Sequence, residues 1–209
     1  MHSATKWLSS HVDTVLGVLA TNSPTMHARL SFLQNAIGAV PFPFDSYLAH
    51  RGLKTLYLCA KRANASALAI ALALKASPDI VAVSYPGLPS HPQRNLVLKQ
   101  HKHNGAGGGI LAFRIRGGYE SARRFCQHSG LFTLAESFVG VQSLAEVPGP
   151  MTHVLMSKEE RAAISVADDL IRLSCGVEET KDLVGDVLKS VESAVSWIDP
   201  TVMWEGPVV

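Results

Sequence analysis

Leu170-Ile171-Arg172-Leu173-Ser174-Cys175 is the stretch that decides the fold. Apolar residues dominate it and an Asp pair precedes it, a pattern typical of a short buried strand. Three other stretches have the same character and are bounded by Gly, Pro or Asp clusters. We therefore predict four strands, over residues 80–85, 110–116, 131–136 and 170–175.

Helical patterns fill the gaps between these strands. Ser157 stands three residues before Glu160, the spacing of a capping box at a helix start. In the last helix, over residues 180–197, an apolar stripe at helical spacing can cover a small sheet; it consists of Leu183, Val187, Val191 and Ala194. We expect helices over residues 94–102, 119–128, 157–163 and 180–197. Strands alternating with helices predict an α/β domain over 79–198, followed by a loose tail over 199–209.

Residues 1–78 differ in kind from this domain. The run 12–20 is β-branched and Leu-rich, and predicts a strand. Ser23-Pro24 then begins a helix that ends at Gly38, and 44–76 predicts a long helix with a kink at Gly52. One strand without a sheet needs partners elsewhere, so we expect the end of a larger domain with apolar surface exposed over residues 12–40.

Composition narrows the classes of function. The 209 residues are 47% hydrophobic and 17% charged, which favours a packed globule over a disordered chain. The net charge of +2 comes without a Lys/Arg block, so a nucleic-acid partner is not expected. No apolar stretch reaches the roughly 20 residues of a membrane span, and no signal peptide is indicated. Three cysteines without metal spacing favour a reducing compartment, the cytoplasm.

Two polar groupings could carry chemistry. Ser3-Ala4-Thr5-Lys6 places two hydroxyls within three residues of an amine, which can hold a phosphate while the amine attacks a carbonyl. By itself this string more often marks a solvated chain end. Arg172 interrupts a strand that is otherwise apolar, so it should face a carboxylate in the chain or open onto a cleft, where it could clamp a substrate carboxylate.

Two other patterns are weaker indications of a functional site. The glycines in 105–109 precede a strand instead of opening a helix, so we interpret them as a flexible turn and not as a phosphate loop. His91, His101 and His103 lack Cys or carboxylate neighbours at ligand spacing, and we predict no metal site.

Seven segments, in order along the chain, resemble the C-terminal portion of the Cys/Met-metabolism family of pyridoxal-phosphate enzymes. They are Ser3-Ala4-Thr5-Lys6, then residues 34–41 (QNAIGAVP), 51–56 (RGLKTL), 85–92 (YPGLPSHP), 131–137 (LFTLAES), 151–153 (MTH) and 170–174 (LIRLS). Where the family has Gly-His-Ser-Asp after the lysine, this chain has Ser10-His11-Val12-Asp13.

The resemblance implies a fold and a set of roles. The fold is the C-terminal part of a fold-type I transferase dependent on pyridoxal 5'-phosphate, with 1–78 as the end of the large cofactor-binding domain plus connecting helices. Lys6 falls on the family's Schiff-base lysine, which also moves protons between substrate carbons. Ser3 and Thr5 fall on the hydroxyls that bind the cofactor phosphate. Arg172 falls on the arginine that clamps the substrate α-carboxylate, and Ser143 and Thr152 fall on positions lining that pocket.

The activity implied is α,γ-elimination of cystathionine to cysteine, 2-oxobutanoate and ammonia, in transsulfuration. Other members of the family that share these motifs carry out β-elimination or γ-synthesis, and a non-catalytic remnant of the family is a further alternative. Full-length members are expected to form homo-oligomers. Several cofactor contacts of the family precede the lysine, so we expect the chain alone to bind the cofactor weakly.

Overall fold

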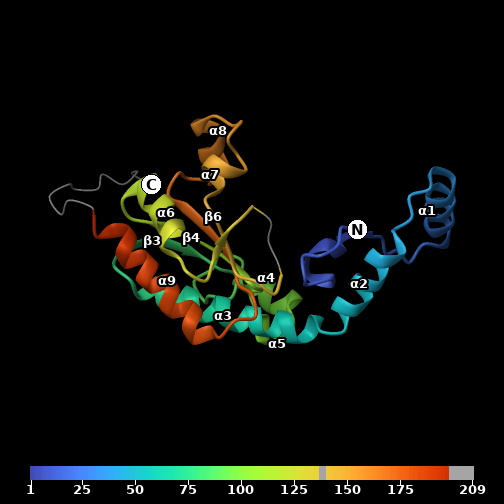
Figure 1. Ribbon diagram of the computed structural model, residues 1–209, viewed down its shortest axis with the longest axis horizontal. Coiled ribbons are helices and arrows are strands. Elements are labelled where there is room, and N and C mark those ends of the chain that lie inside the picture. Colours follow the sequence, from blue (N-terminus) through green and yellow to red (C-terminus); the bar gives the residue numbers. More distant parts are fainter. Residues whose placement is uncertain (137–139, 198–209) are drawn as a thin grey trace. The chain divides into compact units, whose positions relative to one another are not determined.

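A computed structural model describes residues 1–136 and 140–197; the tail expected over 199–209 lies outside the described residues. Contacts divide the chain into two units, Met1–Cys59 and Ala60–Val209, and the helix α3 (Leu56–Ala76) crosses the division. Each unit is coloured along the sequence in Figure 1 and is described here by itself.

The first unit begins with a two-stranded sheet around a single turn. Strand β1 (His2–Ser3) pairs in antiparallel fashion with β2 (Gly17–Val18), and the π-helical turn η1 (Ala4–Leu8) follows β1 directly. The predicted strand over 12–20 is therefore wrong in length, and its partner lies within this chain. Val12 has φ +58°, a left-handed conformation that no extended strand accommodates, so the apolar run does not pair along its length.

Two helices complete this unit. Helix α1 (Pro24–Ile37) starts where the Ser23 side chain accepts a hydrogen bond from Met26 N, and it ends at Gly38 with φ +66°. The long helix predicted over 44–76 is instead two helices, because α2 (Pro43–Leu53) ends before α3 begins.

Apolar exposure in residues 12–40 is confirmed. The large apolar side chains of this range that are more than a third exposed are Val12, Val15, Val18, Leu19, Met26, Phe32, Leu33, Ile37 and Val40. Helix α1 buries none of its residues within the described chain, although half of them are apolar by type. Such a surface is typical of a region that packs against further polypeptide.

The second unit is built on a five-stranded mixed sheet. The strand order is β3-β4-β7-β6-β5, antiparallel except for the parallel pair β5 and β6. The strands are β3 (Ile80–Ser84), β4 (Ile110–Ile115), β5 (Thr133–Leu134), β6 (Leu144–Glu146) and β7 (Leu170–Ser174). Four of them confirm the predicted positions, with β5 shortened to two residues. Strand β6 is too short to show alternation in the sequence, and the prediction missed it.

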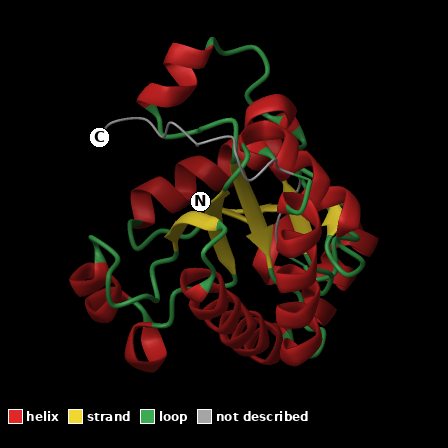
Figure 2. Ribbon diagram, turned by 90° about the vertical axis from the view of Figure 1, so that its left-hand side faces the viewer, coloured by secondary structure: helices red, strands yellow, loops and turns green. Residues whose placement is uncertain are grey.

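Helices flank this sheet, and they can be followed by colour in Figure 2. Helix α6 (Gly118–His128) packs against α9 (Thr180–Val195) and against β4 and β7, and α9 runs along the sheet (Figure 1). The shorter helices are α4 (Arg94–Gln100), α5 (Lys102–Gly105), α7 (Pro148–Met151) and α8 (Lys158–Ala163). The single helix expected over 94–102 is interrupted at His101, whose backbone is extended.

Alternate side chains of the strands point into the core between the sheet and the helices. On β4, Leu111, Phe113 and Ile115 are buried and alternate with half-buried residues. The Phe113 ring meets Phe125 of α6 edge to face, with 5.3 Å between ring centroids. From α9, Leu183, Val187, Val191 and Ala194 are buried, which confirms the predicted apolar stripe.

The Gly-rich segment 105–109 is packed tightly around Tyr85. The buried Tyr85 hydroxyl donates to Gly108 O at 2.9 Å, and Gly108 N donates to Asn64 Oδ1 of α3 at 2.9 Å. A Cβ on Gly107 would lie 2.6 Å from Tyr85 Cζ and 2.8 Å from Gly87 Cα. Gly107 therefore serves close approach between two loops, which a flexible turn does not require.

We predict opposite effects for two Gly→Ala substitutions in this unit. Gly107→Ala should lower the free energy of unfolding by about 2 kcal/mol, because its Cβ overlaps backbone and ring atoms. Gly185→Ala, in the middle of α9 with open space around its Cβ, should raise that free energy by about 0.5–1 kcal/mol through helix propensity. Urea unfolding of both variants tests this, and equal effects would contradict the packing argument.

Candidate active site

Lys6 lies in the middle of the turn η1, where the backbone departs from helical geometry. Its φ of −91° and ψ of −125° lie between two stretches of helical turn, so the residue sits at a kink. The side chain is half-buried. Backbone bonds hold the entry to this turn, since Ala4 N and Thr5 N both donate to Leu16 O, at 2.7 and 3.2 Å.

The residues after Lys6 close the turn from the other side. Ser9 N donates to Ala4 O and Ser10 N donates to Lys6 O, both at 2.9 Å. The Ser10 side chain donates to Trp7 O at 2.5 Å. Ser10 and Val12 have φ values of +59° and +58°, which non-glycine residues adopt at a cost of about 1–3 kcal/mol each. Such strain persists only where the surrounding structure dictates it, and it concentrates at functional sites.

Thr5 has the hydrogen-bonding capacity that phosphate binding requires. Its Oγ1 accepts a bond from Leu16 N at 3.0 Å, which orients the hydroxyl and uses a lone pair. The hydroxyl proton of Thr5 can therefore be donated to an anion. Ser3 is exposed at the end of β1, in register with Gly17. The two hydroxyls and the Lys6 amine fit a phosphorylated aldehyde such as pyridoxal phosphate, which needs donors for its phosphate and an amine for its carbonyl.

Arg172 lies in β7, at the centre of the sheet in the second unit. Its register partners are Ala112 on β4 and Glu146 on β6. Residues directly opposite in an antiparallel pair place their side chains on the same face, about 5 Å apart at Cβ. The half-buried Arg172 thus has the completely buried carboxylate of Glu146 as its cross-strand neighbour. The sequence left two interpretations of Arg172, a carboxylate within the chain or an open cleft. For the first, Glu146 is the candidate carboxylate.

Thr152 is linked to this carboxylate. Its hydroxyl donates to Glu146 Oε1 at 2.8 Å, and His153 Nδ1 lies 2.9 Å from the same hydroxyl and 3.2 Å from Pro148 O. Because a carbonyl only accepts, these contacts assign a proton to His153 Nδ1. Within the part of the chain that the structure describes, Glu146 Oε2 is buried without a hydrogen-bond partner. Glu146 is not among the residues predicted from the sequence, where the available signal is an acid inside the apolar run 144–147.

Ser143 is completely buried and ties the start of β6 to the segment after β7. Its hydroxyl donates to Glu178 Oε2 and accepts from Gly176 N, both at 2.8 Å, while its own N donates to Glu178 Oε1 at 2.8 Å. The hydroxyl protons of Ser143 and Thr152 are thus both used inside the chain. They bind Glu178 and Glu146, the second of which is the register partner of Arg172, and Glu178 is a second residue that sequence reasoning missed.

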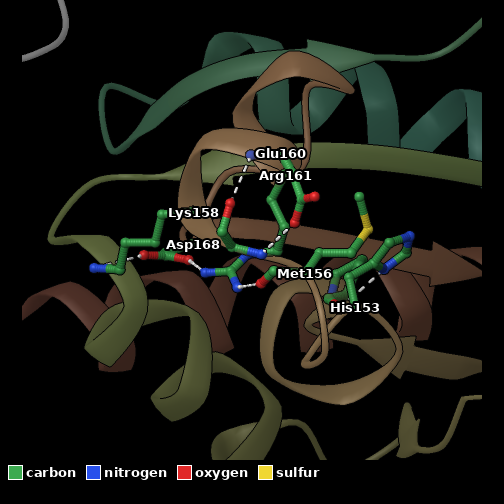
Figure 3. Close-up of polar contacts among 8 residues, drawn as sticks. His153, Met156, Lys158, Glu160, Arg161 and Asp168 are labelled. Carbon is green, nitrogen blue, oxygen red and sulfur yellow. Dashed lines mark hydrogen bonds and ion pairs between the residues drawn. The ribbon is translucent and has the colours of Figure 1, made fainter.

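The excursion between β6 and β7 is held by an ion cluster on Arg161 (Figure 3). Arg161 donates to Met156 O at 3.0 Å and to Asp168 Oδ1 at 2.7 Å, and Lys158 lies 3.4 Å from Asp168 Oδ2. The predicted capping box is confirmed, since Glu160 N donates to Ser157 Oγ and Ser157 N to Glu160 Oε2. The bond from Arg161 holds the pKa of Asp168 below its usual value.

The thiols of the second unit are poor nucleophiles. Burial raises the pKa of both Cys126 and Cys175 to about 12. At neutral pH they are protonated, so neither offers the thiolate that covalent catalysis needs.

Metal clusters and membrane-spanning helices are both absent from the described residues. No group of three or more His, Cys, Asp or Glu side chains that could hold a metal ion occurs in 1–136 and 140–197. In the same residues, no helix is both long and apolar enough to cross a membrane.

The predicted site residues thus fall into two groups. Ser3, Thr5 and Lys6 lie together at β1 and η1 in the first unit. Ser143, Thr152 and Arg172 lie on or next to the paired strands β6 and β7 of the second unit, where Glu146 and Glu178 connect to them through register and hydrogen bonds.

The chain is similar to known proteins over most of its length. A family model described as Cys/Met metabolism PLP-dependent enzyme matches residues 1–192. The chain is 52% identical over 197 residues to a cystathionine gamma-lyase of Saccharomyces cerevisiae, covering 94% of this chain and 50% of the relative. It is 46% identical to a cystathionine gamma-lyase of Dictyostelium discoideum, covering 92% and 49%. The chain spans about half the length of the curated relatives it matches.

Solved structures give the same result. The crystal structure of cystathionine gamma-lyase from yeast matches with a TM-score of 0.90 and 53% identity, over 93% of this chain and 49% of that one. A cystathionine gamma synthase from Xanthomonas oryzae pv. oryzae, in complex with aminoacrylate and cysteine, matches with a TM-score of 0.88 and 36% identity, over 94% and 50%.

We predict that Ser143→Ala destabilises the second unit. The substitution leaves the buried Gly176 N without its acceptor and Glu178 Oε2 without its hydroxyl donor, so the free energy of unfolding should fall by about 1–3 kcal/mol. Ser193→Ala, on the half-exposed side of α9, should change it by less than about 0.5 kcal/mol. Urea unfolding monitored by circular dichroism compares the two, and a Ser143→Ala effect as small as the control would contradict the bonding described.

We also predict a pH-dependent contribution from Asp168. Because its folded pKa is lowered from 3.8, its ion pair stabilises the fold above that pH, and the contribution is lost as the pH falls through the folded pKa. Asp168→Asn and Arg161→Met should each reduce the free energy of unfolding at pH 7, with a smaller difference from wild type at pH 3. Urea titrations at both pH values measure this. A difference that grows toward low pH would contradict the sign.

Proposed function

Because the chain belongs to the Cys/Met metabolism family of PLP-dependent enzymes, we propose that it is the portion of a carbon–sulfur lyase that supplies the cofactor lysine and the substrate-carboxylate arginine. The observation that carries this proposal is the turn at Lys6. It holds an amine at a kink, next to a Thr5 hydroxyl whose proton can go to a phosphate. Bound pyridoxal phosphate would supply an electron sink for carbanions next to the amino group.

In this proposal the first unit binds the cofactor. The hydroxyls of Ser3 and Thr5 would donate to the phosphate, and Lys6 Nζ would hold the aldehyde and supply the amine that takes up and returns substrate protons. Leu16 N orients the Thr5 hydroxyl from the opposite side. The extent 1–78 for the end of the cofactor-binding domain remains part of this proposal, as does an α/β domain over 79–198.

The second unit would bind the amino-acid substrate. The planar guanidinium of Arg172 can hold an α-carboxylate through two parallel hydrogen bonds. Thr152 acts by fixing the Glu146 carboxylate opposite Arg172, and Ser143 acts by fixing the loop after β7. Both side chains would therefore shape the carboxylate pocket without donating to the substrate themselves.

We propose cystathionine as the substrate and α,γ-elimination as the reaction, with cysteine, 2-oxobutanoate and ammonia as products. Support comes from the cystathionine gamma-lyases at 43–52% identity, against 36% for the gamma synthase of Xanthomonas oryzae. A gamma synthase remains the second candidate because its structure matches almost equally well. We also propose a cytoplasmic, homo-oligomeric enzyme, supported by three free cysteines and by the exposed apolar side chains of α1.

Covalent trapping tests the role of Lys6. The purified chain is mixed with pyridoxal phosphate and reduced with borohydride, which captures even a weak and reversible adduct. Peptide mapping should place most of the pyridoxyl label on Lys6, and Lys6→Ala should lose that label while a Lys54→Ala control keeps it. Label spread evenly over the lysines would refute the proposal. Assays with cystathionine then separate 2-oxobutanoate, the α,γ product, from pyruvate, the α,β product.

A further inference from the structure

The turn that carries Lys6 is closed by the two serines that follow it. Ser9 N donates to Ala4 O and Ser10 N donates to Lys6 O, and the Ser9 hydroxyl adds a bond to Thr5 O at 3.3 Å. Both serines are completely buried. Any displacement of their backbone is therefore passed through these bonds to the turn itself.

Helix α2 approaches the Ser9 backbone closely at Gly52. A Cβ built on Gly52 would overlap the carbonyl oxygen of Ser9 and lie 2.6 Å from its C and 2.9 Å from its Cα. All three atoms are backbone, so no side-chain rotation relieves the overlap. The same carbonyl accepts a hydrogen bond from His11 Nδ1 at 2.7 Å, which restrains it from a second side.

The conformation of Gly52 does not itself require glycine. It is helical, and Gly52 O accepts bonds from Thr55 N and Thr55 Oγ1, both at 3.0 Å, as α2 ends. In a helix, alanine is favoured over glycine by about 1 kcal/mol. The reason for glycine at this position is thus the approach to Ser9, and not a turn or a positive φ.

We propose that Gly52 is a positioning residue for Lys6. Because glycine has no Cβ, α2 can pack directly against the backbone of Ser9. Ser9 and Ser10, through their hydrogen bonds to the turn, then fix the position of Lys6. The relevance to catalysis rests on the role proposed above for Lys6, while the mechanical coupling does not. A side chain at position 52 displaces Ser9, and the displacement reaches Lys6 through the Ser10 N to Lys6 O bond.

Hydrogen exchange of the full chain tests the coupling without any cofactor. Gly52→Ala should speed amide exchange of residues 4–10 by about tenfold or more, because the bonds that close the turn are displaced. Gly185→Ala is the matched control: it adds a Cβ to a helical glycine with open space around it, and it should leave residues 4–10 unchanged. Unchanged exchange in Gly52→Ala overturns the proposal.

Labelling with pyridoxal phosphate and borohydride gives the functional readout. Gly52→Ala should lower the fraction of label on Lys6 relative to Lys54 by about threefold or more, since a displaced amine is misaligned. Faster exchange without this loss would show that Gly52 supports the fold only, and would overturn its positioning role. If wild-type Lys6 takes no preferential label, the proposed function fails, while the exchange result still decides the coupling.

A second variant covers the case in which Gly52→Ala unfolds the first unit. Ser9→Ala removes the bond from the Ser9 hydroxyl to Thr5 O and adds no atom near α2. It should speed exchange over residues 4–10 less than Gly52→Ala does, and leave the amides of α1 unchanged. Exchange over residues 4–10 at the wild-type rate in Ser9→Ala would show that the closure does not hold the turn, and the proposal would fall.

Discussion

Strand β7 is the constraint on which the second unit depends, because it pairs with β4 on one side and β6 on the other. A central strand has both rows of backbone groups bonded, so its register cannot slip without moving every side chain to the other face. That register fixes Arg172 opposite Glu146 and brings Ser143 beside the segment that follows β7. The polar cluster proposed to hold the substrate is therefore a result of the pairing between β6 and β7.

The Lys6 turn is held in place by local contacts and not by strand pairing in a large sheet. It has no large sheet to hold it, and its shape is imposed by short-range hydrogen bonds between residues 4 and 16 and by the approach of α2. Left-handed Ser10 and Val12 show that this segment is held away from its intrinsic preferences. The family resemblance places Gly at the position of Ser10, and a positive φ at that position gives a physical reason for it.

Patterns of local origin could be predicted from the sequence. The strands at 80–84, 110–115 and 170–174 and the capping box at Ser157 depend on neighbours in the chain, and periodicity or spacing identifies them. Strand β6 and the pairing of Glu146 with Arg172 depend on a partner 26 positions away, which no local pattern encodes. The Gly52 contact is equally non-local. The roles of Lys6 and Arg172 came from motif resemblance, and their chemistry alone left a solvated chain end and a structural ion pair as alternatives.

The excursion between β6 and β7 leaves the sheet next to the point where it returns, since Glu146 and Arg172 are register partners. Internal bonds hold it at the Ser157 cap and where Arg161 binds Met156 O and Asp168, and the Thr152 hydroxyl ties it to Glu146 of β6. The entropy of closing a loop grows only slowly with its length. Changes of length or sequence inside this segment should therefore cost little entropy and leave the alignment of β6 and β7 intact.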